Sequence, residues 1–256
     1  MANNDTIQKT LLVAVSLCVD CSILVSGAAV ALKDRQVANQ LEDRNRNILA
    51  AAGLLEEGVS VAEQFSRVEP RLVDLRTGRF SDELDAGSFD QMKASKDPSL
   101  STVLSSEQDI AKIKRLEHFA VVYVIEEAGQ LDKVILPVRG YGLWSTMLGF
   151  VALEADLNTV AGLGFYQHGE TPGLGGEIDN PNWISLWPGK QVFQDGEVAL
   201  SLIKGVVDTP RSGAEFQVDG LAGATLTARG VTNLVHFWMG EQGFGPFLAN
   251  LKAGKA

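Results

Sequence analysis

The stretch "HFAVVYVIEEAGQLDKVILPV", residues 118–138, decides the fold class. Residues 118–127 and 133–138 are rich in β-branched and aromatic side chains, and a turn containing Gly129 separates them. Two such runs around a glycine turn are typical of a β-hairpin. The pattern returns in "TMLGFVALEA" and "TVAGLGFYQH", which flank Asp156, Leu157 and Asn158. The two hairpins together predict an antiparallel sheet.

Weaker signals surround these hairpins. The segments 197–205 ("EVALSLIKG") and 215–219 ("EFQVD") are further strand candidates. In "TLTARGVTNLVHFWMG", which starts at Thr225, apolar side chains recur at the spacing of one helix face: Val231, Leu234, Val235 and Trp238. The fold class is therefore α+β, an antiparallel sheet flanked by helices.

The residues before the first hairpin favour helices and loops. Residues 37–52 predict a helix that ends at Gly53, and Ser60 with Glu63 forms a capping box for a short helix that stops near Pro70. Residues 81–106 are polar and predict a loop.

Residues 11–32, "LLVAVSLCVDCSILVSGAAVAL", form an apolar segment without a basic residue. As a helix rising about 1.5 Å per residue, it would cover the ~30 Å hydrocarbon core of a bilayer. A secretory signal peptide is the alternative, because residues 29–31 resemble a cleavage site. The apolar run is longer than a usual signal core, which favours a single transmembrane helix.

Asp20 lies in the middle of this segment, where a carboxylate costs about 2.5–3.5 kcal/mol on insertion scales. It either faces a protein partner or is protonated and tolerated, and the cost favours the partner. Cys18 and Cys21 lie on the same face of the helix. An iron–sulfur site needs more ligands than these two, so thiols packed against neighbouring helices are the better interpretation.

The whole chain has 256 residues and a formal net charge of −10. Such a negative surface argues against nucleic-acid binding. The three histidines, His118, His168 and His236, show no metal-ligand spacing.

Three glycine-rich stretches hold the candidate site. In "VDGLAGATLTARGV", residues 218–231, small residues precede a helix that begins near Gly223 or Ala224. A helix start offers free N–H groups and a positive dipole end, so Thr225 lies where a phosphate would be stabilised. An ordinary glycine-rich turn is the alternative.

The other two stretches are "YQHGETPGLGGEIDNPNW", residues 166–183, and "RGYGLWS", residues 139–145. In the first, a proline followed by glycines allows the backbone to approach a flat ligand, or forms a simple surface loop. In the second, Tyr141 and Trp144 could stack on a ring system or belong to the core.

The three stretches together resemble the FMN-binding domain family and, within it, the C subunits of sodium-translocating NADH:quinone reductases. "DGLAGATLT" is similar to that family's signature, "HGETPGLGG" to its flavin loop and "GYGLW" to a third hallmark. The resemblance covers nearly the whole chain and implies FMN held by a phosphoester to Thr225. One departure is Ala222, where the family usually has Ser or Thr.

The resemblance implies a set of flavin-site residues and no catalytic residue or metal. Besides Thr225, the set consists of Asp219, Ala222, Gly223, Ala224, Gly140, Tyr141, Gly142, Leu143, Trp144, His168, Glu170, Thr171, Pro172, Gly173, Leu174, Gly175 and Lys204.

The resemblance also implies partners and a location. A magnesium-dependent flavin transferase would attach the FMN. Electrons would then pass from an iron–sulfur centre in membrane subunits to the FMN of a B subunit, with ubiquinone as the final acceptor. The soluble domain would be periplasmic and anchored in the bacterial inner membrane. The cations after the segment, Lys33, Arg35, Arg44 and Arg46, favour the cytoplasm instead, but long domains translocate largely regardless of nearby charge.

The domain boundaries and two alternatives complete the predictions. We expect a tail at 1–10, the transmembrane helix at 11–32 and the FMN-binding domain at 33–256, with a lead-in at 33–115 and a flavin-binding core at 116–256. The alternatives are the G subunit of the related Rnf electron-transport complex and a non-redox anchored binding or assembly module.

Overall fold

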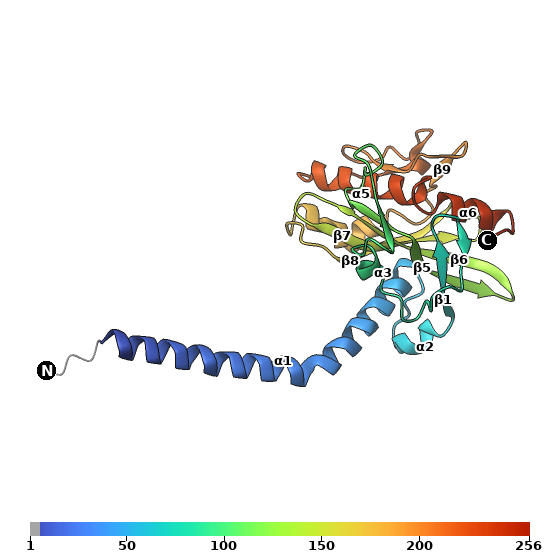
Figure 1. The fold of residues 1–256 in the computed structure, drawn as a ribbon. Coiled ribbons are helices and arrows are strands. Elements are labelled where there is room, and N and C mark those ends of the chain that lie inside the picture. The colour runs from blue at the N-terminus through green and yellow to red at the C-terminus, as the bar shows by residue number, and fades with distance from the viewer. Residues whose placement is uncertain (1–5) are drawn as a thin grey trace. The chain divides into compact units, whose positions relative to one another are not determined.

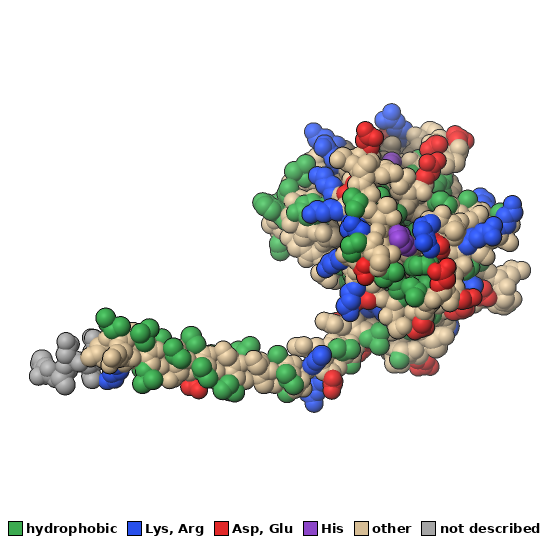
Figure 2. Space-filling model, in the orientation of Figure 1, with side chains coloured by type: hydrophobic (Ala, Val, Ile, Leu, Met, Phe, Trp, Pro, Cys, Tyr) green, Lys and Arg blue, Asp and Glu red, His purple; other side chains and the backbone are tan. Residues whose placement is uncertain are grey.

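The computed structural model describes residues 6–256 and divides into two compact units, Met1–Arg44 and Asn45–Ala256 (Figure 1). From Ile7 onward, the residues of the first unit belong to α1 (Ile7–Ala51), a helix of 45 residues. The length and apolar composition of α1 are sufficient for a membrane crossing, and they are equally compatible with a signal sequence. Between Ile7 and Leu32 the exposed side chains of α1 are largely hydrophobic, and Asp20 is the only acidic residue there (Figure 2).

The prediction of separate helices at 11–32 and 37–52 was wrong, because α1 continues through both. The charged residues from Lys33 onward suggested a break. They are mostly good helix formers, however, and no glycine or proline interrupts residues 33–52. The helix ends before Gly53, which has a φ of +69°, as expected of a glycine at a helix C-terminus.

The second unit is built on a six-stranded sheet with the strand order β2-β1-β5-β6-β7-β8. All neighbouring strands are antiparallel, and both predicted hairpins, β5–β6 and β7–β8, are confirmed. The strands are β1 (Val68–Asp74), β2 (Arg79–Phe80), β5 (Phe119–Glu127), β6 (Gln130–Tyr141), β7 (Thr146–Glu154) and β8 (Val160–Gln167). The sequence pattern did not predict β1.

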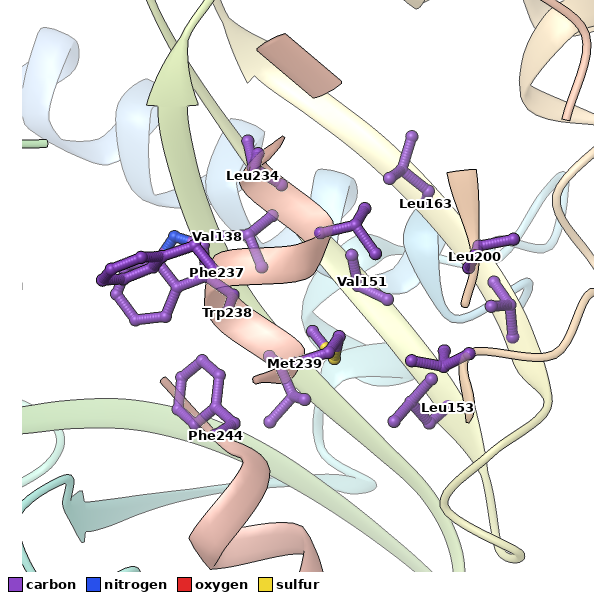
Figure 3. Packing of buried hydrophobic residues seen from close by; sticks show 14 of the residues in the cluster. Val138, Val151, Leu153, Leu163, Leu200, Leu234, Phe237, Trp238, Met239 and Phe244 are labelled. Carbon is purple, nitrogen blue, oxygen red and sulfur yellow. The ribbon is translucent and has the colours of Figure 1, made fainter. Parts of the chain in front are cut away.

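The two faces of the sheet are covered by different helices. Along β5, Ala120, Val122 and Val124 face one apolar cluster, while Val121 and Tyr123 face the other. The first cluster contains α5 (Thr225–Met239), whose Leu234, Phe237 and Trp238 pack with sheet residues (Figure 3). The second contains the last turn of α1 and α2 (Val61–Phe65). Because both faces are covered, β5 is an almost continuous apolar run.

Short elements connect this framework, and some of them differ from the predictions. The predicted loop at 81–106 contains α3 (Gln91–Ala94) and β3 (Ser101–Val103), which pairs with β4 (Arg115–Glu117). The single strand predicted at 197–205 is two strands in different sheets, β10 (Glu197–Val198) on β9 (Phe193–Gln194) and β11 (Ser201–Leu202) parallel to β12 (Gln217–Val218). The remaining elements are η1 (Gly175–Asp179), α4 (Pro181–Ile184), η2 (Ala214–Phe216) and α6 (Gly245–Lys252).

Candidate functional site

The three glycine-rich stretches converge at the start of α5. The first, residues 140–145, is the end of β6 and the turn into β7. The second, residues 168–176, follows β8, and the third leads into α5 at Thr225. The strand pairing of β6, β7 and β8 brings the first two stretches together, and α5 packs against β6.

The Glu170 carboxylate joins all three stretches. It accepts hydrogen bonds from the backbone N–H groups of Leu143, Trp144 and Ser145 at 2.9–3.2 Å. It also accepts the Thr227 hydroxyl at 2.6 Å. Only 4% of Glu170 is exposed. A buried carboxylate needs this many donors, because burial without partners would cost several kcal/mol.

Burial of Glu170 would by itself raise the pKa of its carboxyl group. The hydrogen bonds from Thr227 and from the backbone at Trp144, Leu143 and Ser145 outweigh this effect and hold the pKa below its ordinary value. The group is therefore ionised at neutral pH.

Two glycines make room for this carboxylate. A Cβ atom on Gly142 would lie 2.6 Å from Glu170 Oε1. One on Gly175 would lie 2.5 Å from the Thr227 hydroxyl oxygen and 2.9 Å from Glu170 Oε2. On α5, a Cβ on Gly230 would lie 2.6 Å from the Tyr141 carbonyl oxygen, so this helix approaches the β6–β7 turn closely.

His168 forms two hydrogen bonds at the start of the 168–176 loop. Its Nδ1 accepts the Glu170 N–H at 3.2 Å, and its Nε2 lies 2.5 Å from Asp179 Oδ2. Because Nδ1 accepts, the proton lies on Nε2, which donates to the Asp179 carboxylate. The Ser145 hydroxyl accepts the Gly169 N–H at 2.6 Å and adds a second link to the β6–β7 turn.

The turn before α5 is held by Asp219. Its carboxylate accepts the Val207 N–H at 2.8 Å, and its carbonyl accepts the indole N–H of Trp183 at 2.9 Å. Gly220 N–H donates to the Gly205 carbonyl at 2.9 Å. Lys204 lies exposed on the segment beside this turn.

Thr225 is the first residue of α5 and is exposed. The N-cap residue, Ala224, has no side-chain acceptor. Within residues 6–256, the N–H groups of Thr225 and Leu226 and the Thr225 hydroxyl have no hydrogen-bond partner. Such a helix start can bind an anion.

The stretches that meet here carry exposed apolar side chains. Trp144 is 64% exposed, which excludes the alternative that it belongs to the core. Leu174 lies against Gly223, because a Cβ on Gly223 would be 3.0 Å from Leu174 Cδ2. Tyr141, Leu143 and Leu226 are also exposed. An exposed hydroxyl at a helix start and an exposed indole, on stretches joined through Glu170, fit a ligand with a phosphate and a flat ring.

The structure brings most of the predicted site residues together, but not all in the same role. The stretches that contain Gly140, Gly142, Glu170, Gly175 and Thr225 meet, with Ala222 and Gly223 exposed in the turn. Thr171, Pro172 and Gly173 lie exposed on the loop, where the Thr171 carbonyl accepts the N–H groups of Leu174 and Gly176.

Sequence reasoning missed four residues that build the site: Thr227, Ser145, Asp179 and Trp183. Each forms a hydrogen bond to a residue distant in the sequence. The spacing of Ser145, Asp179 and Trp183 in the sequence therefore does not indicate their role. Thr227 could have been found, because it lies two residues after Thr225 at the predicted helix start.

A cavity of about 620 Å³ lies away from these stretches. It lies between the β9–β10 hairpin and the junction of α5 and α6 and includes Met239. Since Met239 ends α5 and Thr225 begins it, about 20 Å of helix separates the cavity from the site. Among residues 6–256, no cluster of side chains suitable for a metal ion is found.

Comparison with known proteins gives a consistent result. The family model for the FMN-binding domain matches residues 142–240, from the β6–β7 turn to the end of α5. The chain is 56% identical to the C subunit of the Na(+)-translocating NADH-quinone reductase of Pseudomonas aeruginosa over 100% of both chains. It is 49% identical to the C subunit of the Vibrio anguillarum enzyme, over 99% of this chain and 98% of the relative.

Two solved structures are similar as well. The crystal structure of Shewanella oneidensis NqrC has a TM-score of 0.78 and 39% identity, with 84% of this chain and 99% of that chain covered. The C subunit of the Na(+)-translocating NADH-quinone reductase from Parabacteroides distasonis has a TM-score of 0.66 and 28% identity, with 85% and 96% covered.

Proposed function

The chain belongs to the family of C subunits of Na(+)-translocating NADH-quinone reductases, and from this membership we propose that it carries FMN covalently on Thr225. It is a subunit of an oxidoreductase complex, and other subunits of that complex are its partners. This membership decides against the Rnf subunit and the non-redox module as alternatives.

One observation supports the attachment point most strongly. Thr225 presents an unbonded, exposed hydroxyl at the start of α5, inside the segment that matches the FMN-binding domain. Thr227, two residues further, is fully buried and bonded to Glu170. Of the two, only Thr225 is accessible to a modifying enzyme.

The side chains of the chain divide the work. The Thr225 oxygen would carry the phosphate, and the N–H groups at the helix start would stabilise its negative charge. Trp144, Leu143 and Leu174 are exposed apolar side chains that would hold the ring system. FMN, when bound, would supply single-electron transfer, and these residues would orient it.

Among residues 6–256, no side chain is hydrogen-bonded to the Thr225 hydroxyl, so none is placed to act as its general base. The nearest carboxylate in sequence, Asp219, is engaged by the Val207 N–H. Thr225 is therefore an attachment point, and a separate flavin transferase would form the phosphoester. We propose that electrons arrive from an iron–sulfur centre of the membrane subunits and leave for the FMN of the B subunit.

We also propose a single-pass location in the inner membrane with the flavin domain in the periplasm. The apolar part of α1 is compatible with one crossing. A cysteine introduced at the exposed Lys96 should react with a membrane-impermeant maleimide in cells with a permeabilised outer membrane and an intact inner membrane. Labelling only after the inner membrane is disrupted would place the domain in the cytoplasm.

Intact-mass measurement of the full chain, co-expressed with a flavin transferase, tests the attachment. We expect an FMN-sized increment that maps to Thr225 within the tryptic peptide 212–229. Thr225→Ala should lose the increment and the in-gel flavin fluorescence, whereas Thr209→Ala, at an exposed threonine in a loop, should keep both. A colourless wild-type chain refutes the proposal.

A further inference from the structure

The Glu170 carboxylate connects the β6–β7 turn to α5 through its hydrogen bonds to Leu143, Trp144, Ser145 and Thr227. We call this set of hydrogen bonds the clamp. Attachment of FMN to Thr225 does not by itself require it. We propose that Glu170 and Thr227 are positioning residues that hold the exposed indole of Trp144 in a fixed place relative to the first turn of α5. The clamp is a property of the unmodified chain; its effect on the flavin rests on the proposed function.

The carboxylate has little capacity left to bind a ligand. Oε1 accepts the N–H groups of Leu143, Trp144 and Ser145, and Oε2 accepts Leu143 N–H and the Thr227 hydroxyl. Each carboxylate oxygen offers about two acceptor sites. With 4% of the residue exposed, Glu170 acts on the protein rather than on the flavin.

The two ends of the clamp lie beside the two groups that a flavin would use. Thr227 is in the first turn of α5, two residues from the Thr225 hydroxyl. On the other end, the clamp holds the backbone N–H of Trp144 itself at 2.9 Å. Because 64% of Trp144 is exposed, its position depends on this backbone anchor more than on core packing.

A carboxylate fits these donors better than the corresponding amide. If a glutamine kept its oxygen at the Oε1 position, its NH₂ group would lie at the Oε2 position, where it could donate to the Thr227 hydroxyl but could not accept the Leu143 N–H. The absence of a Cβ on Gly142 and Gly175 leaves space for a carboxylate at this place. Tyr141 supports the same turn, since its hydroxyl donates to the Trp144 carbonyl at 3.1 Å.

The test uses two substitutions that remove the clamp from opposite ends, Glu170→Gln and Thr227→Val. Thr227→Ser keeps the hydroxyl, and Glu107→Gln changes an exposed glutamate outside the site. The first measurement is ¹⁹F NMR of the unmodified full chain labelled with 5-fluorotryptophan. Trp144 is identifiable because the other three tryptophans, Trp183, Trp187 and Trp238, are at most 7% exposed.

The second measurement is the fluorescence anisotropy of the flavin in chains whose FMN increment at Thr225 is equal by mass. We expect Glu170→Gln and Thr227→Val to shift the Trp144 resonance toward the denatured position and to lower the flavin anisotropy by at least one third. Thr227→Ser and Glu107→Gln should match the wild type.

The proposal is overturned if both clamp variants fold, by circular dichroism, and leave the Trp144 resonance unchanged. If Glu170→Gln does not fold, Thr227→Val and Thr227→Ser decide alone. A wild-type chain without FMN would refute the proposed function, but the ¹⁹F comparison would still test the clamp.

Discussion

Substitution of Arg139, in β6, should strongly lower the free energy of unfolding of the FMN-binding domain. Arg139 and Glu117 form a buried ion pair, with 5% and 1% of the residues exposed. The guanidinium also donates to the Arg115 carbonyl at 2.8 Å. Glu117 has one further donor, Gln91, and its Oε2 atom has no hydrogen-bond partner among residues 6–256.

The magnitude follows from what each substitution leaves behind. Arg139→Met leaves the Glu117 carboxylate buried without its cation, which should lower the free energy of unfolding by about 3–5 kcal/mol. Loss of the guanidinium near the Trp238 ring, 5.4 Å from its centroid, adds under about 1 kcal/mol. The double variant Glu117→Leu, Arg139→Met removes both charges and should lie within about 2 kcal/mol of the wild type.

Urea unfolding of the full chain in detergent, followed by tryptophan fluorescence, measures this directly. All four tryptophans lie between residues 144 and 238, so the signal reports only on the domain. The slope of the free energy of unfolding against urea concentration should stay the same, because the variants expose the same surface area on unfolding. If Arg139→Met costs less than about 1 kcal/mol, or the double variant is as unstable as the single one, the argument from the unpaired charge is refuted.

Four further predictions concern the site and the membrane segment. Gly175→Ala should destabilise the domain by about 1–3 kcal/mol, because its Cβ would lie 2.5 Å from the Thr227 hydroxyl oxygen; Gly164→Ala, with its nearest atom at 3.9 Å, is the control in thermal melts. The folded-state pKa of Glu170 is lowered, so its stabilising contribution is complete above its ordinary pKa and is lost as the pH falls through the folded value. The stability difference between wild type and Glu170→Gln should therefore shrink on acidification below about pH 4.5; a difference that grows contradicts this sign. Ala222→Ser, at an exposed position before α5, should speed FMN attachment up to about fivefold, equivalent to one hydrogen bond of ~1 kcal/mol; an unchanged rate in a mass-spectrometric time course shows that the hydroxyl is dispensable. Asp20→Leu should reduce recovery of the assembled complex while leaving the FMN content per chain unchanged, and equal recovery on native gels refutes a partner-facing Asp20.

The parts of the fold with a local pattern could be predicted from the sequence. The two hairpins follow from paired apolar runs, one pair around a turn with Gly129 and the other around Asp156, Leu157 and Asn158. Helix α5 follows from its apolar spacing. Strand β1 was missed because Pro70 and the charges around it suggest the end of a helix. In the structure Pro70 lies within the strand and pairs with Tyr123 in register. Strands β10, β11 and β12 lie within the predicted segments 197–205 and 215–219, whereas β9 was not predicted. Each of these strands has only two residues, so its pairing depends on tertiary contacts.

In the site, too, features with a local sequence pattern could be predicted and those that depend on tertiary contacts could not. The three stretches could be singled out from their glycines, and the resemblance to a family predicted that they act together. The role of Glu170 could not be derived, because its partners are 25 to 57 residues away in the chain. Likewise, the sequence marks Asp219 as part of a signature, but its bond to Val207 depends on the path of an irregular segment.

The burial of Thr227 beside the exposed Thr225 has a consequence for the order of folding and the proposed attachment of FMN. In an unfolded chain the two hydroxyls, separated by one leucine, would be almost equivalent to a modifying enzyme. Once α5 has packed and the Thr227 hydroxyl is bonded to Glu170, only the Thr225 hydroxyl of the two remains accessible. Folding before modification would therefore act as the step that ensures a single, correctly placed flavin, and premature modification would be a source of error that the fold itself removes.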